Sequence, residues 1–295
     1  MLAAEMNNSR QTTLDEPVSY SGIGIHSGEE CHVKIEPAAA NYGIRFVRTD
    51  LRGRPEIPVC PDVIAPAGAG RQTTLVAPDQ PEAVVQTVEH ILAALSGLQI
   101  DNVRIEMDGQ EAPIDDGSAA NITERLLQAG TRDLDHSARC VFRVPGSLSF
   151  RPNARSTVAY TIWPSQGLTI SYFLEYDHPL IGRQAVSFDI TPDVFSKQIA
   201  PARTFCLQEE VEYLRSKGLI RGGSLDNAIV VGRERIIGNE LFWPDEMARH
   251  KLLDLMGDLA MLGVPIRGHI ISHMGGHATN AEFVEYLRKE MSENA

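Results

Sequence analysis

Hydrophobic residues recur at helical spacing in PEAVVQTVEHILAALS, residues 81–96, and this pattern predicts an amphipathic helix. Asp79 and Glu82 resemble a capping box at its start, and Gly97 is a typical stop signal. The next stretch, DNVRIEMDG, alternates apolar with polar residues and predicts a half-buried strand. A second helix is predicted over 118–129. The first half therefore contains a helix, a strand and a helix in that order.

The second half of the chain repeats this order. The pattern predicts a helix over 245–262, a strand over 266–273 and a helix over 278–291. Strand-like stretches come before each set, ECHVKIEPA and GIRFVRTD in the first half and STVAYTIWP and LTISYFLEYD in the second. We therefore predict an α+β fold of two similar domains, 1–135 and 136–295. Each should have a mainly antiparallel sheet and a pair of helices, with the helices packed between the two sheets and small inserted elements.

Composition limits the possible functions. The 295 residues suffice for two domains and a core that can bury a site. Lys and Arg number 27 against 39 Asp and Glu, and the net charge of −12 argues against a nucleic-acid partner. No apolar run approaches the roughly 20 residues of a membrane helix, and the segment MLAAEMNNSRQTTLDEP lacks the features of a signal peptide. We expect a cytoplasmic protein without stable membrane insertion, and the four widely spaced cysteines predict neither a zinc ribbon nor a redox motif.

Glu89 and His90 stand side by side in the first predicted helix, where most other positions are apolar or small. Burying an acid and an imidazole is costly unless they are used, so the pair is a candidate site. A surface Glu beside a His that bonds to a backbone carbonyl is the plainer interpretation. The usual zinc-peptidase motifs are missing their second histidine, because Gln86 and Ala93 occupy the positions concerned.

A second cluster lies in the segment RHKLLDLMGD. His250 and Asp254 are four residues apart, so they share one face of a helix, as two ligands of one metal must. Asp258 extends this face by another turn. An ordinary solvated helix face with His, Lys and Asp at this spacing is the alternative.

The two clusters complement each other. His90, His250 and Asp254 together offer two imidazoles and one carboxylate, a ligand set that suits zinc and leaves a fourth position for water. Glu89 lies next to one ligand and is a candidate to take a proton from that water, whose pKa the metal lowers toward about 7. The sequence therefore predicts a hydrolytic metal site.

A leaving amine also needs a proton, and the stretch HMGGHATN offers candidates to supply it. His277 follows a predicted strand at a Gly-Gly turn, and Asp258 is a candidate to hold it protonated. His269 and His273 alternate within the same strand and fit structural roles. Spacing alone does not rank the three histidines.

At this point the chain resembles the zinc-dependent UDP-3-O-acyl-N-acetylglucosamine deacetylases of lipid A biosynthesis. The similarity covers nearly the whole chain, in the order typical of the family. The matching blocks are GIGIHSGEECHVKIEPA, RQTTL, TVEHILAALSGLQIDN, EAPIDDGSA, ARTF, GLIRGGSLDNAIVV, DEMARHKLLDLMGDL and GGHATN.

The resemblance implies the same ligands and base, one zinc ion per chain, and His277 as the general acid with Asp258 in support. It further implies that Thr204 of ARTF donates a hydrogen bond to the oxyanion, and that Lys251 is a cation near the polar head or diphosphate of the substrate. Without the resemblance, Thr204 is an ordinary loop or strand residue and Lys251 a solvated helix lysine. These two roles rest on analogy.

Phe205 and the segment LQEEVEYLRSKGLI resemble an inserted βαβ element near 200–230 that forms the acyl-chain passage in the family. The lining residues that the resemblance implies, besides Phe205, are Leu207, Val211, Leu214 and Leu219. At helical spacing such residues also fit a plain core. The chain departs from the usual family pattern at Cys206, where Gly is common, and in GGHATN, where SGHALN is more usual.

The resemblance implies hydrolysis of the N-acetyl group of UDP-3-O-acyl-N-acetylglucosamine, giving a free amine and acetate. The expected protein is a monomer that takes this nucleotide sugar as its partner and at most touches a membrane peripherally. A zinc deacetylase for another N-acetylated sugar is the alternative within enzymes. A nucleotide-sugar-binding protein without catalysis is the alternative outside them, and it would be expected to have lost a base or a ligand.

Overall fold

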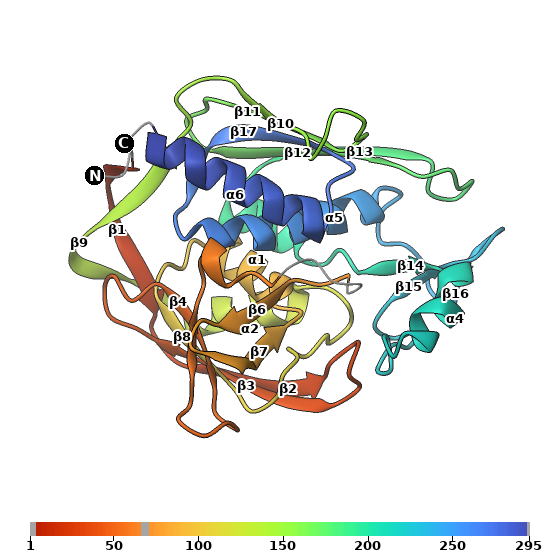
Figure 1. Cartoon of the computed structure of the whole chain (residues 1–295), viewed down its shortest axis with the longest axis horizontal. Helices are drawn as coiled ribbons and strands as arrows, with labels where there is room; N and C mark the ends of the chain where they lie inside the picture. The colour runs from red at the N-terminus through yellow and green to blue at the C-terminus, as the bar shows by residue number, and fades with distance from the viewer. Residues whose placement is uncertain (1–3, 66–70, 294–295) are drawn as a thin grey trace.

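Two large sheets enclose a layer of helices in the computed structural model, which describes residues 4–65 and 71–293 (Figure 1). The seven-stranded sheet contains β1 (Ala4–Leu14), β9 (Thr131–Arg143), β10 (Leu148–Phe150), β11 (Ala159–Trp163), β12 (Leu168–Glu175), β13 (Arg183–Asp189) and β17 (Ile266–His273). The five-stranded sheet contains β2 (Val18–Ile23), β3 (Glu30–Pro37), β4 (Ile44–Arg48), β5 (Glu56–Pro58) and β8 (Val103–Met107). The helices α1 (Glu89–Gly97), α5 (Glu246–Leu259) and α6 (His277–Glu293) lie between the sheets (Figure 1). The predicted α+β class and the position of the helices are confirmed.

Alternation of side chains along the strands builds the core. In β3, Cys31, Val33 and Ile35 are buried while the residues between them are exposed, because successive side chains of a strand point to opposite faces. β17 alternates in the same way. Most strand pairs are antiparallel, as predicted, but β4 pairs with β8 in parallel, and β17 is parallel to both β12 and β9.

The helices α1 and α5 cross at very short range. A Cβ atom at Gly257 would lie 2.1 Å from the carbonyl oxygen of Glu89, so only glycine allows this approach. Nearly every residue of both helices is buried. A helix that is covered on all sides lies at the centre of a core, and these two helices come from opposite halves of the chain.

The start of the first predicted helix is wrong. Residues of the predicted first turns form β7 (Gln80–Gln86), which pairs antiparallel with β6 (Thr74–Ala77), and α1 begins only at Glu89. Ala83 and Val85 are buried with an intermediate Val84 between them. The valines fit both a period of 2 and a period of 3.6, and their β-branched side chains favour the strand. The predicted capping box is therefore wrong: Asp79 lies in the turn between β6 and β7, and Glu82 lies in β7.

The other predicted elements are confirmed with small shifts at their ends, namely α2 (Ala120–Ala129), β8, α5, β17 and α6. The predicted division at 135/136 falls inside β9, whose partner β1 comes from the first half. The seven-stranded sheet thus takes one strand from the start of the chain. The division into domains stays a prediction. The first three residues, part of the segment inspected for a signal peptide, lie outside the described residues.

A small sheet projects to one side of the two layers (Figure 1). It contains β14 (Phe205–Leu207), β15 (Ile229–Val231) and β16 (Ile236–Ile237), and α4 (Gln208–Ser216) connects the first two strands. Because β14 and β15 are parallel, β14, α4 and β15 form a βαβ unit, as the resemblance implies. Residues 205–237 are called the insert below. The remaining short helical turns are Pro61–Val63, α3 (Pro192–Val194), Phe195–Ile199 and Ala260–Leu262.

Within residues 4–65 and 71–293, no helix has the length and apolar character needed to cross a membrane.

Candidate active site

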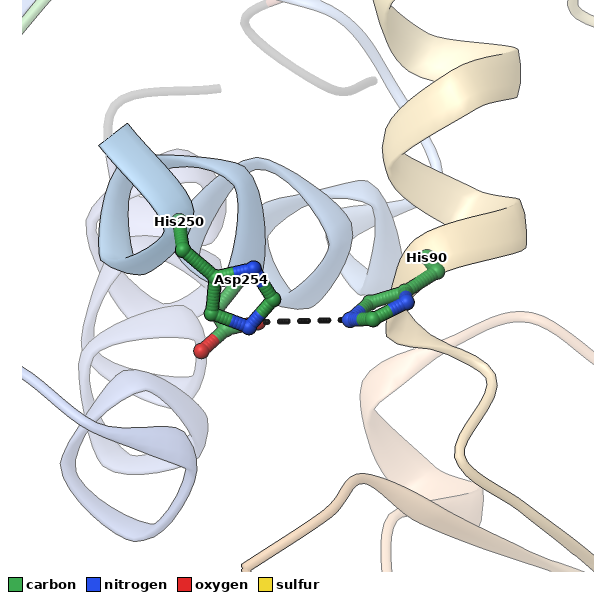
Figure 2. A group of neighbouring side chains, drawn as sticks. All are labelled: His90, His250 and Asp254. Atoms are coloured by element: carbon green, nitrogen blue, oxygen red, sulfur yellow. Dashed lines mark ion pairs between the residues drawn. The ribbon is translucent and has the colours of Figure 1, made fainter. Parts of the chain in front are cut away.

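Three predicted ligands meet where α1 and α5 cross. The possible ligand atoms of His90, His250 and Asp254 all lie within 4.8 Å of one another, and the three side chains are buried. The Nε2 atom of His250 is 3.3 Å from Oδ1 of Asp254, and that of His90 is 3.8 Å from the same oxygen. Figure 2 shows His90 on α1 facing the two side chains of α5. Helical spacing brings His250 to Asp254, and the packing of the two halves brings in His90.

The protonation states of these side chains suit a divalent cation. Burial lowers the pKa of His90 to about 3, with a further contribution from His250, and burial also lowers the pKa of His250. The Nδ1 atom of His250 lies 3.0 Å from the carbonyl oxygen of Ala202, so Nδ1 holds the proton and Nε2 offers a lone pair. Burial acts to raise the pKa of Asp254, but His250 and Lys251 outweigh it and hold that pKa well below its usual range. Neutral imidazoles and a carboxylate are the donors that metal binding requires.

Glu89 lies beside the predicted ligands, and a backbone hydrogen bond from Thr73 fixes its carboxylate. It is 3% exposed, and its Oε2 accepts a hydrogen bond of 3.1 Å from the backbone N–H of Thr73. Burial is the main cause that raises the pKa of Glu89, to about 7, and the nearby Asp258 and Asp254 add to it. A carboxylate with a pKa near neutrality is suited to accepting a proton.

His277, the first residue of α6, faces this carboxylate. Its Nε2 lies 3.7 Å from Oε1 of Glu89 and 3.7 Å from Oδ2 of Asp254, while its Nδ1 lies 2.9 Å from Oδ2 of Asp258. Burial acts to lower the pKa of His277, but Asp258 and Glu89 outweigh it and raise this pKa to about 10. The Nδ2 of Asn280 also donates to Oδ2 of Asp258 at 2.7 Å. The imidazole is therefore protonated at neutral pH and oriented by Asp258.

The structure separates the three histidines that spacing left unranked. His269 contacts Ser171 Oγ at 2.9 Å through Nε2, and His273 contacts the carbonyl oxygen of Thr157 at 2.9 Å through Nδ1. Neither is among the residues that line the cavity described next, whereas His277 is.

A cavity of about 800 Å³ opens onto these groups and runs toward the insert. This volume falls in the range of about 300–1,000 Å³ that is usual for ligand pockets. The predicted site residues that line it are Glu89, His90, Thr204, Phe205, Val211, Leu214, His250, Lys251, Asp254 and His277. Cys206, where the chain departs from the usual family pattern, also lines it.

Two of the expected lining residues, Leu207 and Leu219, are not among the residues around this cavity, and their role stays a prediction. Leu207 is half-buried at the start of α4 and packs against the hydrophobic core. Spacing at 207, 211 and 214 suggested a single face, but Leu207 precedes the helix in extended conformation and so does not share the helical period.

Lys251 lies beside the predicted metal ligands. Its Nζ is 2.8 Å from Oδ2 of Asp254 and 5.7 Å from the centre of the Phe205 ring. Thr204 is fixed by its backbone, since its N–H donates to Gly117 and its carbonyl accepts from Ile229. The Thr204 side chain therefore stays at the wall of the cavity.

Three residues of the site escaped the sequence analysis. Thr73 contacts Glu89 and the His277–Asp258 pair. Glu111, 2% exposed, accepts hydrogen bonds from the backbone N–H groups of His26 and Ser27 and from the hydroxyl of Thr87. His26 lines the cavity, and its backbone carbonyl accepts from Arg221 of the insert.

These residues had left only weak signals. Thr73 and Glu111 stand in the blocks RQTTL and EAPIDDGSA, where nothing in the local pattern suggests a role. Thr87 has a φ of 55°, an unusual value for a β-branched residue, but this strain is visible only in the structure. His26 stands in the block GIGIHSGEECHVKIEPA, where the local pattern again suggests no role.

Two histidines and an aspartate around one position, with a carboxylate and an imidazole beside them at a deep cavity, are the arrangement of a hydrolase that works with a metal ion. The family model of UDP-3-O-acyl N-acetylglycosamine deacetylase, LpxC, matches residues 11–289. The chain therefore belongs to the UDP-3-O-acyl N-acetylglycosamine deacetylase family.

Individual relatives agree with the family. A UDP-3-O-acyl-N-acetylglucosamine deacetylase of Nitratidesulfovibrio vulgaris is 44% identical over 283 residues, which cover 96% of this chain and 89% of that protein. Another of Oleidesulfovibrio alaskensis is 42% identical over 97% of this chain and 94% of its own length. A bifunctional enzyme LpxC/FabZ of Chlorobaculum tepidum is 38% identical over 96% of this chain, which spans 65% of that longer protein.

Proposed function

We propose that the chain hydrolyses the N-acetyl group of UDP-3-O-acyl-N-acetylglucosamine with one zinc ion, giving UDP-3-O-acyl-glucosamine and acetate, as a step of lipid A biosynthesis. The observation that carries this proposal is that His90, His250 and Asp254 lie at the same end of one cavity as Glu89 and His277. Family membership supports the substrate. A cytoplasmic location, a monomeric state and at most peripheral membrane contact belong to the same proposal.

The ligand set supports zinc as the ion. Two neutral histidines and one carboxylate match the composition of catalytic zinc sites, which keep one position open. When bound, zinc supplies a positive charge that polarises the amide carbonyl and makes water easier to deprotonate.

Glu89 would act as the general base. Its carboxylate is beside the ligands without being needed as one, and its pKa of about 7 matches proton transfer from water near neutral pH. Thr204 and Lys251 also line the cavity, and they would donate to the charge that develops on the carbonyl oxygen. Lys251 is held there by its ion pair with Asp254.

His277 would protonate the leaving amine through Nε2. Its protonated state follows from Asp258 and Glu89, and its Nδ1 contact with Asp258 directs Nε2 into the cavity. Asp258 supports the acid without touching the reacting atoms. The apolar wall that Phe205, Val211 and Leu214 contribute would take the 3-O-acyl chain.

The test is acetate release from UDP-3-O-acyl-N-acetylglucosamine by the metal-loaded protein, combined with measurement of bound metal per chain. We expect acetate in step with zinc occupancy near one ion per chain, and a rate that depends on both the acyl chain and the UDP group. A rate unchanged when the acyl chain is removed would instead favour a deacetylase for another N-acetylated sugar. If none of these substrates releases acetate, the proposal is rejected.

A further inference from the structure

Thr73 lies between the elements that carry the proposed base and the proposed acid. It precedes β6, is 6% exposed, and contacts α1, α5 and α6. Its backbone N–H donates to Oε2 of Glu89 at 3.1 Å. Its hydroxyl donates to Oδ1 of Asp258 and lies 3.2 Å from Nδ1 of His277. A single residue therefore touches three groups of the site.

The hydroxyl contacts constrain where the proton of His277 is. A threonine hydroxyl has one hydrogen to donate, and Thr73 uses it on Oδ1 of Asp258. Its contact with His277 then requires the oxygen to accept, so Nδ1 of the imidazole must carry a hydrogen. Oδ2 of Asp258, at 2.9 Å from the same nitrogen, is also an acceptor. Both the Thr73 oxygen and Oδ2 of Asp258 can therefore accept a hydrogen bond from Nδ1. In the neutral tautomer with hydrogen only on Nε2, the Nδ1 lone pair would face these two acceptors without a hydrogen bond.

The backbone contact constrains Glu89 in a matching way. Because Oε2 of Glu89 is occupied by the N–H of Thr73, Oε1 is the oxygen that faces Nε2 of His277, at 3.7 Å. The side chain of Asp258 is fixed as well, since Thr73 binds one carboxylate oxygen and Asn280 the other. Oε1 of the proposed base and Nε2 of the proposed acid therefore lie 3.7 Å apart at the cavity.

We propose that Thr73 is a positioning residue that keeps a hydrogen on Nδ1 of His277, both in the imidazolium and in the neutral form left after Nε2 has given up its proton, and that turns the reactive edges of His277 and Glu89 toward each other. The proposal rests on the roles given above to these two groups. Replacing the hydroxyl should leave the substrate wall and the metal ligands in place, because Thr73 is not part of either. The expected loss is therefore one of turnover and not of binding.

The first experiment compares Thr73→Val with Thr73→Ser in the metal-loaded enzyme. Valine keeps the shape and the backbone N–H but removes the hydroxyl, and serine keeps the hydroxyl. We expect Thr73→Val to lower kcat by about 10-fold to 100-fold, the scale of one hydrogen bond to a charged group, with little change in KM or in bound metal. Thr73→Ser should restore most of kcat. The matched control is Thr74→Val, since Thr74 is the neighbouring residue, is half-buried and begins β6.

The result that would overturn the proposal is a kcat for Thr73→Val equal to that of the wild type, or equal losses in the valine and serine variants. A loss carried by KM or by bound metal would also overturn it, because it would mean a structural role.

The second experiment reads the imidazole itself and does not depend on turnover. In ¹⁵N-histidine NMR spectra of the metal-loaded protein, His277 is assigned by comparison with His277→Gln. We expect Nδ1 of His277 to carry a proton in the wild type on both sides of the imidazole's titration, and the Nδ1 signal to change in Thr73→Val but not in Thr74→Val. A bare Nδ1 in the wild type would overturn the inference even if acetate is released. Protein that releases no acetate but shows the proton on Nδ1 would reject the proposed function alone.

Discussion

The two ends of the cavity are built in different ways. At the end with the proposed catalytic groups, called the catalytic end below, Glu89, His90 and Asp254 are 3%, 7% and 2% exposed, and they come from helices packed at the centre of the core. At the insert end, α4 is fastened by the ion pair of Arg71 with Glu210, whose side chains are 50% and 28% exposed. The backbone N–H groups of Arg221 and Gly222 donate to the loop at His26 and hold the part of the insert that follows α4.

This difference suggests a division of labour. Groups that exchange protons need positions fixed within a fraction of an ångström, and a dense core supplies that. A wall that takes an acyl chain needs adaptable apolar contacts, and a half-exposed βαβ unit with few anchors supplies those. Substitutions at the two ends should therefore differ in both the size and the kind of their effect.

The largest effect is expected at the metal ligands. Asp254→Asn removes the only carboxylate of the cluster, so metal affinity should fall by more than the roughly 100-fold typical of residues that only support a ligand. Activity should fall with it. Metal titration with a chelator measures the affinity, and Asp245→Asn, at the half-buried start of α5, is the control. Unchanged affinity in Asp254→Asn would remove it from the ligand set.

The next effect is expected at the proton-transfer groups. Glu89→Gln and His277→Ala should each lower kcat by about 10²–10⁴-fold, the usual scale for a general base or acid, while the zinc content stays unchanged. Steady-state kinetics on the metal-loaded variants measure this. The controls are Glu82→Gln, an exposed glutamate of β7, and His273→Ala, a partly exposed histidine of β17. Near-normal kcat in either main variant would disprove its assigned role.

A milder way to probe the same end is pH. The base works deprotonated, so kcat/KM should rise as pH passes the Glu89 pKa of about 7. The acid works protonated, so kcat/KM should fall as pH passes the His277 pKa of about 10. A cation in the cluster lowers both values, which moves the plateau between them to lower pH. The rising limb should vanish in Glu89→Gln, and its persistence there would mean that another group is the base.

The smallest effect is expected at the insert. Glu210→Gln breaks the ion pair with Arg71, and exposed pairs contribute at most about 1 kcal/mol, so KM for a long-chain substrate should rise no more than about five-fold. The value of kcat should not change. Kinetics with short and long acyl chains measure this, with Glu209→Gln on the same helix as the control. A large fall in kcat would contradict the contrast between the two ends.

The sequence predicted those parts of the candidate site that depend on residue spacing within one helix. His250 and Asp254 are one helical turn apart, so their pairing needed no tertiary knowledge. The start of α1 was mispredicted because the valines before it fit two periods at once, and only pairing with β6 decides between them. Thr73 was missed because its partners Asp258 and His277 lie 185 and 204 residues away. Its role arises from packing between distant segments, which no local pattern contains.

The missing side chain of Gly257 sets the clearance between the two halves of the protein. The helices α1 and α5 belong to different halves, so a methyl group at this position would widen the gap between His90 and its two partners. A cation bound by residues of both helices would link the two halves. It would bind only when α1 and α5 are packed together, so its binding would stabilise that packing. Removal of the cation should therefore weaken the packing of α1 against α5 before it destabilises either sheet.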